Sequence, residues 1–251
     1  MKPVEFLAKR LPTLRPYPEC MPEITPKLSG RAFFPGGFGR ADNSTDDLPR
    51  HPVMIVGQDF GTIEYWNALG LVDEPSDGTW AEMLRLLESV AIDPSYCFFT
   101  NAIMGIRRDG PITGEHPAFD DREFIDRCLV FLGEQIEQMR PSVVVLLGTI
   151  PAVLFAAHFS LGQLARPKWR GRNSNPTWSD IDREGLQFIE RVPTLGREGE
   201  TFACACVIHP ANRKPNLRLR SWPKAGLAGE KADVEIWRRV AATFRATNEF
   251  S

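Results

Sequence analysis

The sequence lacks the cysteine patterns and long apolar runs that mark several classes of protein. Its five cysteines are scattered, and no two of them have the CxxC spacing typical of zinc and redox sites. No apolar run is long enough to span a membrane or to form the core of a signal peptide. We therefore expect a cytoplasmic protein with free, mostly buried thiols, no metal ion and no cofactor.

Three motifs of well-known α/β enzymes are absent as well. There is no Gly-x-Ser-x-Gly elbow, no phosphate-binding Gly-Lys-Ser/Thr loop and no Gly-x-Gly-x-x-Gly fingerprint after a predicted strand. These absences disfavour an unrelated α/β enzyme that acts on a nucleotide or a small ester. An excess of positive charge is also missing, since the net charge is −2. Any binding to nucleic acid must therefore depend on local basic patches.

The pattern of apolar residues predicts an α/β protein. Short apolar runs bounded by turn residues predict four strands, at 53–56, 96–99, 143–147 and 202–208. Apolar residues at helical spacing predict helices over 80–90, over 124–139, after Pro151 and over 232–245. Because helices alternate with wholly apolar strands, we expect a central, mostly parallel four-stranded sheet with helices on both faces.

The remaining segments define the predicted domain organisation. Residues 1–50, rich in Pro, Gly and polar residues, are interpreted as an N-terminal arm with one short helix near 4–10. The arm packs on a single domain formed by residues 51–251. Residues 160–200 are polar and rich in Arg, Gly, Pro and Trp, and we interpret them as an excursion from the core.

Polar residues follow three of the predicted strands. Asp59 comes after the first strand, Asn101 after the second and His209 after the fourth. Since ligands of open parallel sheets bind at the carboxyl ends of the strands, these three side chains are expected to converge on one site. Each also has a purely structural interpretation, as a helix cap for Asp59 and as a turn residue for Asn101 and His209. The other histidines, His51, His116 and His158, are predicted to be structural or exposed.

Four short motifs resemble those of the uracil-DNA glycosylase superfamily, in the same order and with similar spacing. Gly57-Gln58-Asp59 resembles the start of the Gly-Gln-Asp-Pro-Tyr motif, and Ile208-His209-Pro210 resembles the His-Pro-Ser motif. Phe98 to Asn101 resembles the strand that delivers the base-reading Asn, and Val143 to Gly148 resembles the strand before the His. The resemblance covers about residues 52–222 and implies the three-layer fold of that superfamily, usually as a monomer.

The resemblance implies a role for each residue of the site. Asp59 would stabilise the positive charge that develops on the sugar and orient water, and His209 would donate a hydrogen bond to the departing base. Asn101 would read the edge of uracil with one donor and one acceptor, so that cytosine mismatches. The remaining base-binding positions are assigned to residues near these motifs, with an aromatic stacked on the base: Gln58, Phe60 and Phe99, with Tyr65 and Trp66 as further stacking candidates.

The motifs also depart from the pattern. Phe60 and Gly61 replace Pro and Tyr of the first motif, and a Gly here is similar to the Asn-Pro-Gly motif of the mismatch-specific and single-strand-selective branches. Ala211 replaces a Ser that contacts phosphate, and Arg213 stands where another branch has a wedge Leu. The chain thus combines features of different branches. A pocket widened at Gly61 leaves open a preference for another deaminated base, such as hypoxanthine or xanthine.

Two basic segments are candidates for contact with DNA. Residues 212–224 carry Arg213, Lys214 and Arg218 with no acidic residue, and 166–172 carry further Arg and Lys around Trp169. The sequence therefore predicts a metal-independent enzyme that flips uracil out of single- or double-stranded DNA and hydrolyses its bond to the sugar, leaving an abasic site. The alternative is a non-catalytic reader of uracil or abasic DNA.

Overall fold

The computed structural model describes residues 3–22, 51–64, 78–110, 116–161, 176–222 and 225–248. Its centre is a five-stranded sheet in the order β2-β1-β3-β5-β4. The strands are β1 (Val53–Gly57), β2 (Cys97–Asn101), β3 (Val143–Leu147), β4 (Phe188–Pro193) and β5 (Thr201–Val207). β2, β1, β3 and β5 pair in parallel, and β4 runs antiparallel to β5. The α/β class and the mostly parallel sheet are confirmed.

The fifth strand corrects the predicted strand count. β4 lies in the stretch that the sequence pattern indicated as an excursion, and so does the helix α6 (Trp178–Arg183). β4 is an edge strand in which only Val192 is buried, and it carries Glu190, Arg191 and Pro193. Charged residues and proline are tolerated at a sheet edge, because one side of the strand pairs with nothing. Such a strand therefore lacks the apolar run by which the other four were recognised.

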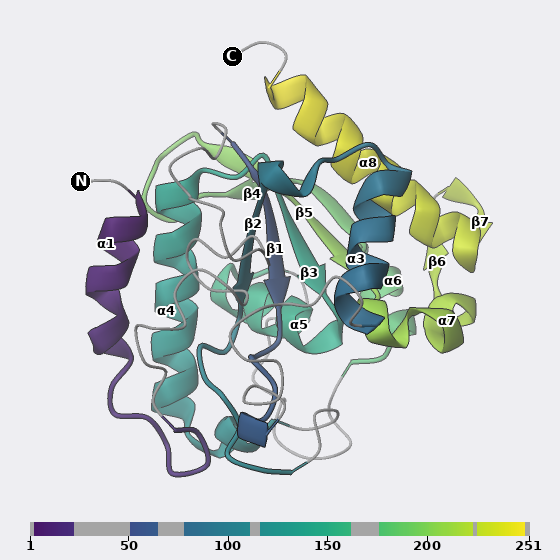
Figure 1. Cartoon of the computed structure of the whole chain (residues 1–251). Coiled ribbons are helices and arrows are strands. Elements are labelled where there is room, and N and C mark those ends of the chain that lie inside the picture. Colours follow the sequence, from purple (N-terminus) through teal and green to yellow (C-terminus); the bar gives the residue numbers. More distant parts are fainter. Residues whose placement is uncertain are drawn as a thin grey trace.

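Helices cover both faces of the sheet and give the molecule three layers (Figure 1). One face packs against α3 (Gly78–Ser89) and α8 (Glu230–Asn248). The other packs against α4 (Arg122–Met139) and α5 (Thr149–His158), with α1 (Pro3–Arg10) lying against α4. Successive strand residues alternate between the two cores, so Phe98 packs toward α4 while Phe99 packs toward α3.

The N-terminal segment contributes to the core on the α4 side. Leu7, Leu14 and Met21 are completely or almost completely buried. Met21 lies over Gly105: a Cβ atom added to Gly105 would lie 2.4 Å from the Cε atom of Met21. Beside it, the Arg108 backbone N–H donates to the carbonyl of Cys20 at 2.9 Å. Residues 19–21 thus support the loop that follows β2. The boundary predicted near residue 50 stays a prediction, because 23–50 lie outside the described residues.

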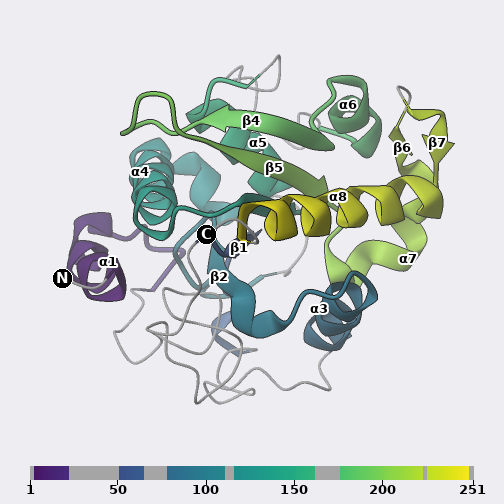
Figure 2. The ribbon, with the colours of Figure 1, turned by 90° about the horizontal axis from the view of Figure 1, so that it is seen from above.

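Short elements connect the main ones, most of them after β5. These short elements are η1 (Leu11–Leu14), η4 (Pro94–Tyr96), η5 (Pro117–Asp120), η7 (Pro210–Asn212), α7 (Arg213–Asn216), η8 (Leu217–Leu219), β6 (Ser221–Trp222) and β7 (Leu227–Ala228). In Figure 2 the helix α7 and the two antiparallel strands β6 and β7 lie beside one end of α8. No helix of the described ranges is both long and apolar enough to cross a membrane.

The order of the strands determines where a ligand can bind. From β1 the chain passes to β2 on one side, and from β2 it crosses to β3 on the other side of β1. The connection that follows β1 therefore leads toward one edge of the sheet, and the connection that follows β3 leads toward the other edge. In open α/β sheets such a reversal opens a crevice beyond the carboxyl ends of the strands, where ligands bind. In this chain Asp59 and Gly148 lie at the two sides of that position.

Candidate active site at the carboxyl ends of the strands

The loops after β1 and β2 remain paired beyond the sheet. Phe60 donates its backbone N–H to the carbonyl of Gly105, and Arg107 donates to that of Gly61 at 2.8 Å. Ile63 in turn donates to the carbonyl of Arg107 at 2.9 Å. Two loops from distant parts of the sequence thus run side by side as an extension of β1 and β2. This pairing places the Arg107 side chain next to Asp59.

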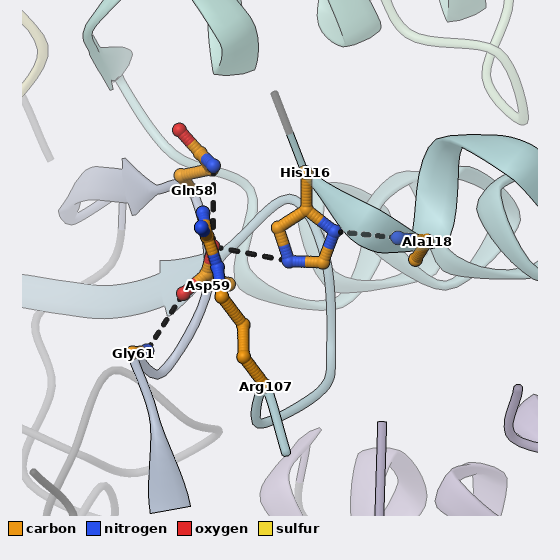
Figure 3. Close-up of polar contacts among 6 residues, drawn as sticks. All are labelled: Gln58, Asp59, Gly61, Arg107, His116 and Ala118. Atoms are coloured by element: carbon orange, nitrogen blue, oxygen red, sulfur yellow. Dashed lines mark hydrogen bonds and ion pairs between the residues drawn. The ribbon is translucent and has the colours of Figure 1, made fainter. Parts of the chain in front are cut away.

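Asp59 lies at the centre of a buried polar network (Figure 3). Arg107 donates to its Oδ2 atom through Nη2 at 2.8 Å and through Nε at 3.1 Å. His116 Nε2 lies 3.1 Å from the same oxygen, and Gln58 Nε2 donates to it at 3.2 Å. The other oxygen, Oδ1, accepts the backbone N–H of Gly61 at 2.6 Å. The side chain of Asp59 is 6% exposed, so the network lies almost entirely out of water.

The hydrogen bonds define the protonation states of this network. Nδ1 of His116 accepts the backbone N–H of Ala118 at 3.1 Å, so the ring proton of the neutral form is on Nε2, facing Asp59. Burial lowers the pKa of His116 and outweighs the opposing effect of Asp59. Burial alone would raise the pKa of Asp59, but the contact with His116 and the hydrogen bonds and positive charge of Arg107 hold that pKa below its usual value. Asp59 is therefore ionised and His116 neutral near pH 7.

Gly61 has a conformational reason to be glycine. Its φ angle is +76°, in the region that other residues adopt only with strain. In this conformation its N–H holds Oδ1 of Asp59. The Gly that replaces Tyr in the first motif thus shapes the turn around Asp59. This role is separate from the predicted widening of the base pocket at Gly61.

Asn101 ends β2 and packs over the end of β1. It is 1% exposed and pairs in register with Gly57. A Cβ atom on Gly57 would lie 2.4 Å from Oδ1 of Asn101, so only glycine leaves room for this amide. The amide nitrogen of Asn101 is buried, and no hydrogen-bond partner for it occurs among the described residues. An unpaired buried donor is costly in a folded protein, which makes this atom a good candidate for a ligand contact.

His209 stands just beyond the end of β5, beside the turn that follows β3. Gly148 in that turn has a φ of +104°, and a Cβ atom there would lie 3.8 Å from Cβ of His209. Nδ1 of His209 accepts the backbone N–H of Ala211 at 3.3 Å. In the neutral ring the proton is therefore on Nε2, the nitrogen that a hydrogen bond to a departing base requires.

The structure does not bring the two predicted aromatic contacts to the surface of this site. Phe99 is completely buried, and its ring packs edge-on against Trp80 of α3 at 4.9 Å between centroids. Phe60 is 5% exposed and lies in the core on the α4 side. A base could stack on either ring only after core packing had opened. Tyr65 and Trp66, the other stacking candidates, lie outside the described residues.

Arg213 is held by carboxylates and does not point freely toward solvent. Its Nε donates to Asp233 of α8 at 3.0 Å, and its Nη1 lies 3.6 Å from Glu82 of α3. Lys214 and Arg218 are exposed on the same segment, and the described part of the chain shows no ion pair for either. Of the three predicted DNA contacts, only these two are placed on the surface. The basic segment 166–172 and Lys224 lie outside the described residues.

A second buried ion pair anchors the far end of the segment that carries His209. Arg220 is completely buried, 3.0 Å from Asp182 of α6, and its guanidinium lies over the ring of Trp178. It also donates to the carbonyl of Cys206 in β5 at 3.1 Å. Ion pairs at Arg213 and at Arg220 thus hold the segment that follows His209.

Two residues of the network, Arg107 and His116, were missed by the sequence interpretation, which placed His116 among structural or exposed histidines. His116 is in fact buried against Asp59. Nothing in the sequence pattern indicates that the loop after β2 folds back onto the loop after β1. Among the described residues no group of three or more His, Cys, Asp and Glu side chains is arranged to hold a metal ion.

The fold and the site define a class: an α/β protein with an open parallel sheet, whose carboxylate, amide and imidazole lie at the ends of three strands. The family model described as the Uracil DNA glycosylase superfamily matches residues 46–229, and the chain belongs to this superfamily. A search of curated proteins gave no match. Membership supports a DNA glycosylase type of function, a hydrolase of base excision repair that acts on DNA.

Proposed function

We propose that the protein is a monofunctional uracil-DNA glycosylase, which hydrolyses the bond between uracil and deoxyribose and leaves an abasic site. The observation that carries the proposal is the buried amide of Asn101, whose donor has no partner in the described structure. An Asn amide offers one donor group and one acceptor, which match the carbonyl and N–H of the uracil edge. On the edge formed by O4 and N3–H of uracil, cytosine has an amino group and an unprotonated N3, so it reverses both positions and would leave buried polar groups unpaired.

The geometry supports a mechanism by charge stabilisation. When the bond between sugar and base breaks, its electron pair leaves with the base and the sugar becomes positive. The ionised carboxylate of Asp59 stabilises that cation, and Nε2–H of His209 donates to the uracil oxygen that becomes negative. A preorganised donor of this kind contributes roughly 3–4 kcal/mol to transition-state stabilisation. Water then adds to the sugar, and its proton leaves with the uracil anion.

A set of labelled oligonucleotides tests the choice of base. The protein, without added metal, is incubated with strands that carry one uracil, one hypoxanthine, one xanthine or a mismatched thymine, and alkali then breaks any abasic site. We expect cleavage at uracil, with the other three bases far slower. Cleavage at hypoxanthine or xanthine alone would contradict the proposed specificity for uracil, but it would still support hydrolysis of the bond between base and sugar.

The contacts of Asp59 favour one other candidate, a non-catalytic reader of uracil or abasic DNA. Arg107 neutralises much of the charge of Asp59, and a neutralised carboxylate stabilises a cation less. A reader binds uracil-containing DNA tightly and releases no base. Turnover in the same incubation excludes it, because a reader leaves every strand resistant to alkali.

A further inference from the structure

The donors around Asp59 are divided unequally between its two oxygens. Within the described residues, Oδ2 faces two nitrogens of Arg107, one of His116 and one of Gln58, whereas Oδ1 accepts only the backbone N–H of Gly61. A carboxylate has about four acceptor positions in all, two on each oxygen. Oδ2 is therefore saturated, and the remaining acceptor capacity of this carboxylate is on Oδ1.

Two of the residues that face Oδ2, Arg107 and His116, are themselves buried. The side chain of Arg107 is 1% exposed and that of His116 is 0% exposed. An unpaired charge at such a depth would be strongly destabilising, so the ionised Asp59 requires the positive charge of Arg107 beside it. With His116 neutral, the three groups carry no net charge.

His116 is not placed to act on substrate. Its Nδ1 accepts the N–H of Ala118, and its Nε2, which carries the proton of the neutral ring, lies 3.1 Å from Oδ2 of Asp59 (Figure 3). A nucleophile or a general base needs one nitrogen with an open lone pair. The ring therefore acts through Asp59, as does Arg107.

We propose that Arg107 and His116 are positioning residues that hold Asp59 by Oδ2, leaving Oδ1 as the only oxygen that orients the attacking water, and that keep Asp59 as a fixed negative charge. The inference rests on the proposed function, because it concerns how the same site hydrolyses DNA. Asp59 then accepts no proton. The water oxygen forms its bond to the sugar, and the water proton passes to the uracil anion, so the carboxylate ends the reaction as it began.

Removal of Arg107 tests the electrostatic part of the proposal. In Arg107→Met the buried Asp59 has lost its counter-ion. Of the described groups in contact with Asp59, His116 is the one that can replace the lost charge by taking up a proton. We expect His116 to titrate at higher pH in this variant than in the wild type. Above that new pKa the rate of uracil excision falls about tenfold for each pH unit. Arg108→Met, which removes the adjacent exposed arginine, keeps the wild-type titration and rate.

Two readouts follow from this design. NMR spectra of the ring nitrogens follow the four histidines of the chain, and the signal lost in His116→Gln identifies His116. Single-turnover excision rates at a series of pH values give the activity profile. Arg107→Met with an unchanged His116 titration and a uniform loss of rate at every pH would overturn the proposal, because that result is what a merely structural role produces.

A second pair of variants keeps the proposal testable if Arg107→Met does not fold. His116→Gln retains a neutral N–H donor for Oδ2, and His116→Phe removes it. We expect the Gln variant to retain at least tenfold more activity than the Phe variant, with similar thermal stability. Equal loss in both would overturn the positioning role. If the wild type itself excises no uracil, the proposed function fails, and the His116 titration in Arg107→Met still decides the electrostatic inference.

Discussion

The amide oxygen of Asn101 occupies the place where a side chain on Gly57 would begin. The two residues pair in register at the ends of β2 and β1, and a Cβ atom at position 57 would lie 2.4 Å from that oxygen. Gly57→Ala must therefore displace the Asn101 amide. We expect it to lower kcat/KM for uracil excision at least tenfold, measured in single-turnover assays.

A double-variant experiment identifies the cause of that loss. If Gly57→Ala acts by moving the amide, then adding it to Asn101→Ala changes the rate little further, because the group that it displaces is already gone. Independent, additive losses would show that Gly57 has another role. Thermal unfolding of all three variants separates this effect from a general loss of stability.

Removing the imidazole of His209 should reduce the rate of the chemical step. The ring carries its proton on Nε2, so His209→Ala deletes a donor to the departing base. We expect kcat to fall by on the order of 10²–10³ while KM changes little. Asn212→Ala in the same loop is the matched control, because it leaves the described backbone contacts of the loop in place. A loss expressed mainly in KM would place His209 in binding instead.

Arg213 should matter for stability more than for contact with DNA. Its side chain is 13% exposed, and its guanidinium pairs with the carboxylate of Asp233, whose side chain is 1% exposed. Arg213→Ala leaves that buried carboxylate unpaired, and we expect a loss of about 3 kcal/mol in the free energy of unfolding at pH 7. Burial already raises the pKa of Asp233, so the loss shrinks at acid pH as Asp233 takes up a proton.

Lys214→Ala is the comparison for that variant. Lys214 is exposed, so stability should hold while the affinity for DNA falls and the salt dependence of binding weakens by about one phosphate contact. If Arg213 instead contacts DNA, as the sequence analysis predicts, Arg213→Ala weakens DNA binding without destabilising the protein. Urea unfolding and salt titrations of DNA binding distinguish the two roles.

His116 should make the folded protein less stable in mild acid. Burial lowers the pKa of His116 in the folded protein below the ordinary value of 6.5. Between the folded and the unfolded pKa, the unfolded chain therefore binds a proton at this ring that the folded chain does not. Stability therefore falls as the pH drops below about 6.5, by at most about 1.4 kcal/mol per pH unit. His116→Gln should flatten this dependence in urea unfolding curves. An equally steep curve in the variant would contradict the prediction. Burial also lowers the pKa of His158, so some dependence of stability on pH remains in His116→Gln.

The elements that sequence reasoning located are those with a local signal. Val143 to Leu147 is a run of β-branched and Leu residues, and it forms the strand β3 over the predicted range. The ends of β1, β2 and β5 were equally visible, because an apolar run stops at a polar residue. From these ends the α/β class, the edge that carries the site and three of its polar residues could be predicted.

The features that escaped prediction depend on contacts between distant segments. Arg107 reaches Asp59 only because residues 60–63 pair with 105–107, a tertiary contact without sequence periodicity. The sequence predicts Arg213 to be a surface cation, because nothing in it shows that Asp233, in the first turn of α8, pairs with this arginine. Phe99 is buried whether or not a ligand lies nearby, so its residue type does not distinguish a stacking platform from core packing.

Simultaneous detection of free uracil and of the abasic strand tests the central claim most directly. The wild type is mixed in excess with a uracil-containing strand, and mass spectrometry measures the released base while alkali reveals the abasic site. We predict one uracil released per abasic site, no strand break before alkali, and loss of both products in Asp59→Asn. An intact strand, no free uracil and tight binding of the same DNA would contradict the account and identify a reader.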